Sequence, residues 1–193
     1  MYEFVLYSRQ GSTDGSFNSL IDAGRLDTVY QCILTSIFKS HGHRADVKFH
    51  VFLYGSPNPP IHLEVIGETL YNVRVDERTW TDILKKVLSG GTHPGINVTK
   101  NSFEAFLKSK ANLVENIFVL EEKGTLIQEV EFGESAIFII GDHIGLPREK
   151  EKFILRYGKK LSLGKQKYLA ASCIDIINYE LDNYVQRKYN FTR

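Results

Sequence analysis

Asp142 and His143 form the first candidate site, because adjacent acidic and imidazole side chains can take part in chemistry. They stand between Gly141 and Gly145, directly after the apolar run 136–140. An aspartate beside a histidine could act in acid–base catalysis or ligate a metal, and it could equally shape a loop for a ligand. The glycines favour a turn at the end of a buried strand. The pair alone leaves all three interpretations open.

Arg25 and Asp27 form a second candidate site. They stand at the start of an amphipathic segment, after a loop rich in serine, aspartate and glycine. In one interpretation Asp27 complements a helix dipole and Arg25 is a solvated flank. In the other, Arg25 is a planar donor for a phosphate or a base carbonyl, and Asp27 accepts a hydrogen bond or a proton. Arg9 follows the first apolar segment and should open toward the same side.

The histidines and cysteines argue against metal binding and covalent catalysis. His41 and His43 form a His-x-His pair without a second spaced cluster, so no metal site is expected. Cys32 and Cys173 lack CxxC spacing, and Cys173 falls on an apolar helical stripe, which favours packing. The absence of GxSxG, Walker and GxGxxG motifs argues against serine hydrolases, P-loop enzymes and dinucleotide dehydrogenases.

The composition is that of an ordinary globular domain, with 193 residues, 42% of them hydrophobic, and a net charge of +1. A protein with so small a net charge is not expected to bind nucleic acid through its overall charge. The segment 148–167 is locally basic, and is either a solvated helix face or a patch for phosphates. No signal peptide and no apolar run of the ~18 residues that a membrane span requires is present, so a cytoplasmic protein without a membrane partner is expected.

Strands and helices that alternate along the chain must position these side chains. Runs rich in β-branched and aromatic residues predict strands at 3–8, 47–54, 117–121, 136–140 and 161–163. Apolar spacing predicts helices at 25–39, 76–88, 102–109 and 165–187. The alternation predicts one α/β domain over residues 1–193, with a mostly parallel sheet and helices on both faces. Ligands bind such sheets at the carboxyl ends of the strands.

Several separated motifs together resemble a known family. The stretches FIIGDHIGL at 138–146, SLG at 162–164 and YLAASCI at 168–174 look like those of the archaeal-type tRNA pseudouridine N1-methyltransferases. These are SPOUT-class enzymes that use S-adenosylmethionine. The likeness extends to AGRLD at 23–27, DER at 76–78 and HPGI at 93–96, and so covers nearly the whole chain. One position departs from the family pattern, because Ser172 stands where the family has a histidine before the cysteine.

The resemblance implies a fold, a cofactor and partners. It implies a SPOUT fold with a C-terminal trefoil knot, and a homodimer that places each cofactor site near the partner chain. S-adenosylmethionine would be the methyl donor and RNA, as tRNA, the substrate, with no metal. By similarity, loops after Leu120, at 141–146 and at 163–173 enclose the cofactor. The residues expected to bind it are Leu120, Ile140, Gly141, Gly145, Leu146, Leu163, Gly164, Leu169 and Cys173.

The implied chemistry is methyl transfer from a sulfonium to N1 of pseudouridine. Asp27 would orient or deprotonate the N1–H, and Arg25 would hold the uracil carbonyl or a phosphate. RNA phosphates would contact Arg9, Arg148 and Lys150. Asp142 and His143 would then shape their loop. Two alternatives stay open: methylation of another RNA position, including the 2′-O of ribose, and a non-catalytic relative that binds cofactor or RNA.

Overall fold

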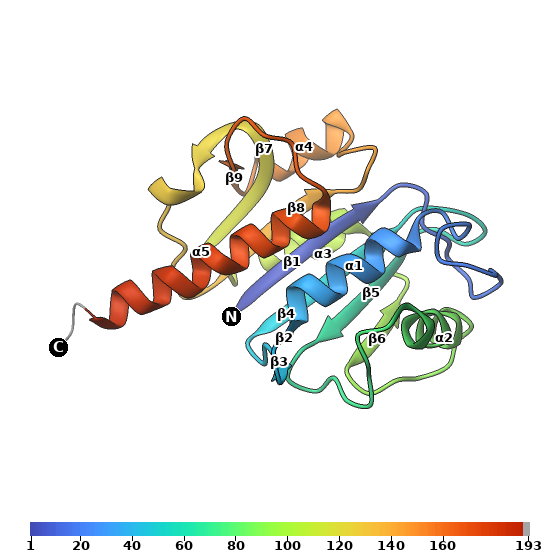
Figure 1. The fold of residues 1–193 in the computed structure, drawn as a ribbon. Coiled ribbons are helices and arrows are strands. Elements are labelled where there is room, and N and C mark those ends of the chain that lie inside the picture. Colours follow the sequence, from blue (N-terminus) through green and yellow to red (C-terminus); the bar gives the residue numbers. More distant parts are fainter. Residues whose placement is uncertain (191–193) are drawn as a thin grey trace.

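One sheet of seven strands organises the protein in the computed structural model (Figure 1), which describes the backbone of residues 1–190 and the side chains of residues 1–184. The strand order is β6-β5-β4-β1-β8-β7-β9. From β4 to β9 in this order the neighbouring strands are parallel, whereas β5 runs antiparallel to both of its neighbours, β4 and β6. The sheet strands are β1 (Tyr2–Ser8), β4 (Val47–Leu53), β5 (Ile61–Ile66), β6 (Ile96–Thr99), β7 (Asn116–Leu126), β8 (Ala136–Gly141) and β9 (Lys159–Ser162). The mostly parallel sheet is confirmed.

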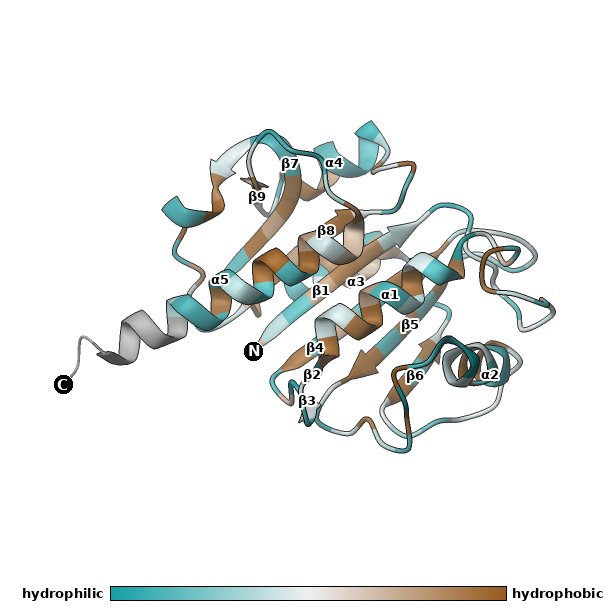
Figure 2. Ribbon diagram, viewed as in Figure 1, coloured by the Kyte–Doolittle hydropathy of each residue, from teal (hydrophilic) through white to brown (hydrophobic). Residues whose placement is uncertain are grey.

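Helices cover both faces of this sheet. Successive residues of a strand point to opposite faces, so each strand contributes side chains to two cores. Phe4 and Leu6 of β1 share a core with α1, α2 and α5, whereas Val5 and Tyr7 share another with α3 and the end of α4. Figure 2 shows the apolar residues concentrated in the strands and on one stripe of each long helix. The helices are α1 (Leu26–Ile37), α2 (Glu77–Leu88), α3 (Phe103–Lys110), α4 (Arg148–Ile154), α5 (Ala170–Asn190) and the 3₁₀ turn η1 (Ile127–Glu129). Within residues 1–190, none combines the length and apolar character needed to cross a membrane.

Capping residues explain where two of the helices begin. Asp76 Oδ1 accepts a hydrogen bond from Thr79 N at 2.9 Å before α2, and Ser102 Oγ accepts one from Ala105 N at 3.1 Å before α3. These bonds satisfy amides that a helix N-terminus otherwise leaves unpaired. The residue before α1 is Arg25, which has no side-chain cap and a φ of 68°. The start of α1 therefore depends on the loop that leads into it.

The structure departs from the sequence prediction in several regions. The pattern does not predict β5, β6 or the small hairpin of β2 (Phe38–Lys39) and β3 (Gly42–His43), because their pairing joins segments across turn-rich loops. The basic segment 148–167 is not a single helix face: it contains α4 and then β9, and α5 begins only at Ala170. β7 also continues to Leu126, beyond an irregularity between Leu120 and Thr125.

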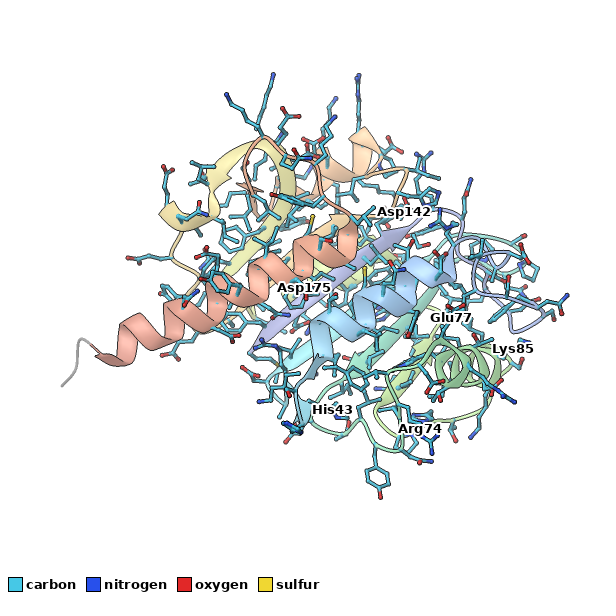
Figure 3. All side chains as sticks on the ribbon, in the orientation of Figure 1. His43, Arg74, Glu77, Lys85, Asp142 and Asp175 are labelled. Atoms are coloured by element: carbon cyan, nitrogen blue, oxygen red, sulfur yellow. The ribbon has the colours of Figure 1, made fainter. Side chains whose placement is uncertain are left out.

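The carboxyl ends of the parallel strands meet at one edge of the sheet. Segments 9–25, 54–60, 142–147 and 163–169 leave the sheet there, after β1, β4, β8 and β9. The first two are tied together, because Thr13 N donates to Ser56 O at 3.1 Å and Gly55 N donates to Gly11 O at 3.0 Å. Figure 3 labels Asp142 at this edge, close to the end of β1. The sheet thus brings the Arg25 loop and the Asp142 loop to the same side.

A buried polar network crosses β1, β4 and β5 on the side covered by α3. Glu3 Oε1 lies 2.6 Å from Lys110 Nζ, Glu3 Oε2 lies 2.9 Å from His50 Nε2, and His50 Nδ1 lies 3.0 Å from His62 Nε2. Burial alone would raise the pKa of Glu3, but the hydrogen bonds with His50 and Lys110 outweigh it and bring the pKa to about 2. Burial, reinforced by His50, lowers the pKa of His62 to about 4. The network therefore holds Glu3 ionised and His62 neutral at neutral pH.

We expect the free energy of unfolding to fall as the pH drops from about 6.5 to about 4. In that window the unfolded chain binds a proton at His62, whereas the folded protein keeps this imidazole neutral. The stabilisation from Glu3 is lost only lower, between its unfolded pKa of 4.5 and about 2. Urea unfolding followed by circular dichroism across this pH range should show a shallower slope for His62→Gln than for the wild type. His143→Gln, at an exposed site, is the control, and equal slopes in all three proteins would contradict the expectation.

Candidate functional site

An open cavity of about 410 Å³ lies where β7, β8 and β9 reach the carboxyl edge. Three segments wall it: the middle of β7, the loop after β8, and the loop that leads from β9 into α5. Its size and its mixture of apolar side chains with a few polar groups are typical of a small-molecule site. The cavity therefore defines the candidate binding site.

Eight of the nine residues expected to bind the cofactor line this cavity. They are Leu120, Ile140, Gly141, Gly145, Leu146, Leu163, Gly164 and Cys173. Leu169 does not line it, and its side chain is 73% exposed. Burial raises the pKa of the Cys173 thiol to about 11, which keeps it protonated and weakly nucleophilic. The structure thus joins three separate segments of the sequence and leaves one predicted residue, Leu169, outside the cavity wall.

Other residues of the cavity wall were not singled out by sequence reasoning. They are Glu121, Glu122, Leu161, Gln166, Lys167 and Tyr168. Each is close in sequence to a residue of the expected set, so adjacency was the available signal. Adjacency cannot tell which side chains face the cavity, because neighbours on a strand point to opposite sides.

Gly141 lets the loop after β8 fold back on the strand. A Cβ at this position would lie 2.6 Å from Leu146 N and 2.7 Å from Gly145 C. Both are backbone atoms, so any larger residue would force the loop open. Gly145 completes the turn with a φ of 82°, in the left-handed region that favours glycine. The two glycines set the shape of this wall of the cavity.

Asp142 ties the same loop to the segment after β1. Its side-chain oxygens accept hydrogen bonds from Arg9 N at 2.7 Å and from Ile144 N at 2.9 Å, and the residue is only 9% exposed. His143 beside it is exposed. Residues 1–190 contain no group of three or more histidine, cysteine, aspartate or glutamate side chains that could hold a metal. Because both carboxylate oxygens are occupied by backbone amides, Asp142 shapes the loop.

We expect Asp142→Ala to lower the free energy of unfolding by about 1–3 kcal/mol, because two part-buried amides lose their acceptor. Hydrogen exchange should speed up at the amides of Arg9 and Ile144. His143→Ala changes an exposed neighbour and is the matched control, with an expected effect within about 0.5 kcal/mol. Similar losses in the two variants would show that Asp142 does not hold the loop.

Arg25 and Asp27 form a bidentate ion pair at the start of α1, outside the cavity wall. Arg25 Nε and Nη2 each lie 2.9 Å from one oxygen of Asp27, and the two side chains are 44% and 14% exposed. The hydrogen bond from Arg25 lowers the pKa of Asp27, so the carboxylate is ionised at neutral pH. The left-handed backbone at Arg25 is uncommon for a residue other than glycine. This strained turn presents a guanidinium and a carboxylate in fixed geometry.

The loop around Arg25 is held by backbone hydrogen bonds. Arg25 N donates to Ile21 O at 3.1 Å, and Ser12 N donates to Ala23 O at 3.0 Å. A Cβ on Gly24 would lie 1.7 Å from Gln10 O, so the loop packs tightly against the segment after β1. The position of Arg25 is thereby coupled to that of Arg9, which is also exposed at this edge.

The residues expected to contact RNA phosphates differ in their surroundings. Arg9 and Arg148 are exposed. Lys150 forms an ion pair with Glu104 of α3, and its Nζ lies 5.9 Å from the ring centroids of both Tyr7 and Tyr54. Lys150 therefore joins α4 to the body of the protein, whereas the other two side chains reach solvent.

Comparison with known proteins identifies the family. Residues 1–185 match the family model described as "Putative SAM-dependent RNA methyltransferase". The chain is 35% identical to a tRNA (pseudouridine(54)-N(1))-methyltransferase of Methanocella arvoryzae, over 94% of this chain and 99% of the relative. It is 34% identical to the protein of the same name from Methanocaldococcus jannaschii, over 94% and 97%.

Among solved structures, the crystal structure of Archaeoglobus fulgidus Nep1 bound to S-adenosylhomocysteine matches with a TM-score of 0.64. The identity is 17%, and the match covers 84% of this chain and 72% of that one, which supports the fold. The chain is therefore a member of the S-adenosylmethionine-dependent RNA methyltransferases. Within that class it belongs to the family of the tRNA (pseudouridine(54)-N(1))-methyltransferases, which confirms the resemblance.

Proposed function

We propose that this protein transfers the methyl group of S-adenosylmethionine to N1 of pseudouridine 54 in tRNA. The observation that carries the proposal is the cavity at the carboxyl edge, which gathers eight of the nine residues assigned to the cofactor by the family resemblance. The relatives of the same family, at 35% identity over 94% of the chain, supply the acceptor. We propose the cytoplasm as the place of action, since the two free cysteines suit a reducing compartment.

The cavity suits the nucleoside of this cofactor. Leu120, Ile140 and Leu146 provide apolar walls for an adenine ring, and the Gly141 turn brings backbone amides and carbonyls within reach of its edge. When bound, S-adenosylmethionine supplies an already activated methyl group. The task left to the protein is to orient the acceptor for in-line attack and to help remove its proton.

Asp27 and Arg25 would perform that task at the acceptor. The ionised Asp27 carboxylate can accept a hydrogen bond from N1–H and align the nitrogen. Its lowered pKa makes it a weak base, so orientation suits it better than complete proton removal before transfer. The Arg25 fork would donate to the uracil carbonyl or to a neighbouring phosphate, exchanging part of its bond with Asp27 for the substrate. Arg9 and Arg148 would contact the RNA backbone, where charge and not base identity matters.

A homodimer is the assembly we propose. Ile144, Tyr168 and Leu169 are 42%, 47% and 73% exposed beside the cavity, which leaves apolar surface at its mouth. A second copy that covers this surface would complete the site and bring Leu169 into it. We also propose that the C-terminal part is threaded as a trefoil knot, as in the SPOUT family. The neighbouring loops 141–146 and 163–169, which both line the cavity, support this threading.

The activity can be tested on nucleosides. tRNA that carries pseudouridine at position 54 should gain N1-methylpseudouridine when it is incubated with the protein and S-adenosylmethionine, as measured by mass spectrometry of the digested RNA. The same tRNA with uridine at position 54 is the control and should gain nothing. Methylation of a ribose 2′-O, or of another position, would refute the acceptor assignment. If a calorimetric titration detects no binding of S-adenosylmethionine, the proposed enzymatic function is refuted.

Removing the ion pair should separate binding from transfer. We expect Arg25→Ala and Asp27→Ala to keep the affinity for S-adenosylmethionine and to slow methyl transfer by about 10²-fold or more, the effect of losing an orienting or acid–base group. Arg74→Ala, which removes an exposed arginine near α2 (Figure 3), is the control and should transfer normally. A large loss of cofactor affinity would instead assign Arg25 and Asp27 to the fold.

The dimer can be tested at its proposed contact. Leu169→Glu should shift the protein from dimer to monomer in sedimentation velocity, because a charge cannot be buried unpaired in an apolar interface. Leu113→Glu is the matched control, since Leu113 is an equally exposed leucine, at 75%, outside the cavity wall. A wild type that sediments as a monomer at micromolar concentration would refute the homodimer.

A further inference from the structure

Glu121 is a charged side chain of the cavity that the proposed chemistry does not use. It is half-buried in the wall, next to Leu120 at the end of the regular part of β7. Among the described side chains of residues 1–184, none donates a hydrogen bond to its carboxylate or forms an ion pair with it. Partial burial leaves such a carboxylate incompletely hydrated, and a ligand that brings donors replaces the missing hydrogen bonds.

The neighbouring charged side chains do not form an ion pair with Glu121. Lys160 Nζ lies 2.5 Å from Glu151 Oε1, so the lysine of β9 is paired with the glutamate of α4. Burial raises the pKa of Glu121, the Glu151 carboxylate adds to this, and Lys160 opposes it only in part. The fold thus places a carboxylate in the cavity wall and leaves its oxygens available to accept hydrogen bonds from a ligand.

The sheet order tells which part of the cofactor this group faces. β8 separates β7 from β1, so the strand of Glu121 lies about 10 Å from β1, at two strand spacings. Arg9 and Arg25, which we propose to hold the RNA substrate, lie in the segment after β1. The methyl group that is transferred must therefore point toward that segment. The apolar lining extends from Ile140 and Leu146, at β8, to Leu120, Leu161 and Leu163 on the β7 and β9 side, away from β1. That side suits the nucleoside half of the molecule.

We infer that Glu121 binds the ribose of S-adenosylmethionine, its carboxylate accepting hydrogen bonds from the 2′ and 3′ hydroxyl groups. Two neighbouring O–H donors match the two oxygens of one carboxylate. The inference rests on the proposed use of this cofactor, and it names a side chain for a contact that backbone atoms alone would otherwise make. A carboxylate aimed at the sulfonium is the competing placement, and cofactor analogues distinguish the two.

Calorimetric titration of wild type and Glu121→Gln with three ligands tests the inference. S-adenosylhomocysteine keeps the ribose but lacks the sulfonium charge, and its 2′-deoxy analogue lacks one hydroxyl group. We expect Glu121→Gln to weaken S-adenosylmethionine and S-adenosylhomocysteine to the same extent, by about 10-fold. The preference of the wild type for S-adenosylhomocysteine over its 2′-deoxy analogue should shrink in the variant. Glu131→Gln, the same change at an exposed glutamate outside the cavity wall, should bind all three ligands as the wild type does.

The stability of the ligand-free protein provides a second readout. Because Glu121 has no ion-pair or hydrogen-bond partner among the side chains of residues 1–184, Glu121→Gln should unfold at the same urea concentration as the wild type or at a higher one. A lower midpoint would assign Glu121 to the fold and overturn the inference. So would unchanged affinities, or a loss confined to S-adenosylmethionine, which would place the carboxylate at the sulfonium. If the wild type binds neither S-adenosylmethionine nor S-adenosylhomocysteine, the proposed function itself fails, and that result is distinct from every outcome for the variant.

Discussion

The carboxylate of Asp142 is the interaction on which the arrangement of the site depends. With one oxygen it holds Arg9 N at 2.7 Å, and with the other it holds Ile144 N at 2.9 Å. The first bond reaches the segment that leads to the Arg25 loop, and the second closes the loop that walls the cavity. A methyltransferase must keep the methyl donor and the acceptor in one fixed geometry, since misplacement by about 1 Å can cost about 10²-fold in rate. Asp142 joins the cavity wall to the segment that leads to Arg25, the two parts of the site that we propose.

The bond of Asp142 can form only because the strands beneath it are in register. Phe4, Phe138 and Phe118 are direct neighbours on β1, β8 and β7. Their rings stack at centroid distances of 5.5 Å and 5.4 Å on one face of the sheet. A shift of one residue would turn every side chain of a strand to the other face, so this buried stack fixes the register. The carboxyl ends of three strands are thereby aligned, and the loops that follow them meet.

Ion pairs within the chain decide how much of the basic segment faces a partner. Lys150 is paired with Glu104 and Lys160 with Glu151, so part of the local charge joins α4 to α3 and to β9. Arg148 remains exposed. This division explains how a protein of net charge +1 can present a limited basic surface without being basic as a whole. Since Lys160 is paired with Glu151, Glu121 forms no ion pair with any described lysine of residues 1–184.

The sequence alone determined the mostly parallel sheet, the presence of α2 and α3, and the family, because apolar periodicity and separated motifs are local signals. It also named Arg25, Asp27 and eight residues of the cavity wall through the resemblance. The resemblance implied that Asp142 shapes its loop, but only the tertiary structure showed how, because its acceptor bond to Arg9 joins residues 133 positions apart. Such long-range contacts also decide the pairing of β5 with β4 and β6 and the partners of Lys150. They decide as well that Glu121 has no ion-pair partner among the described side chains. No local pattern encodes them, since strand pairing and charge pairing are set by which segments the fold brings together.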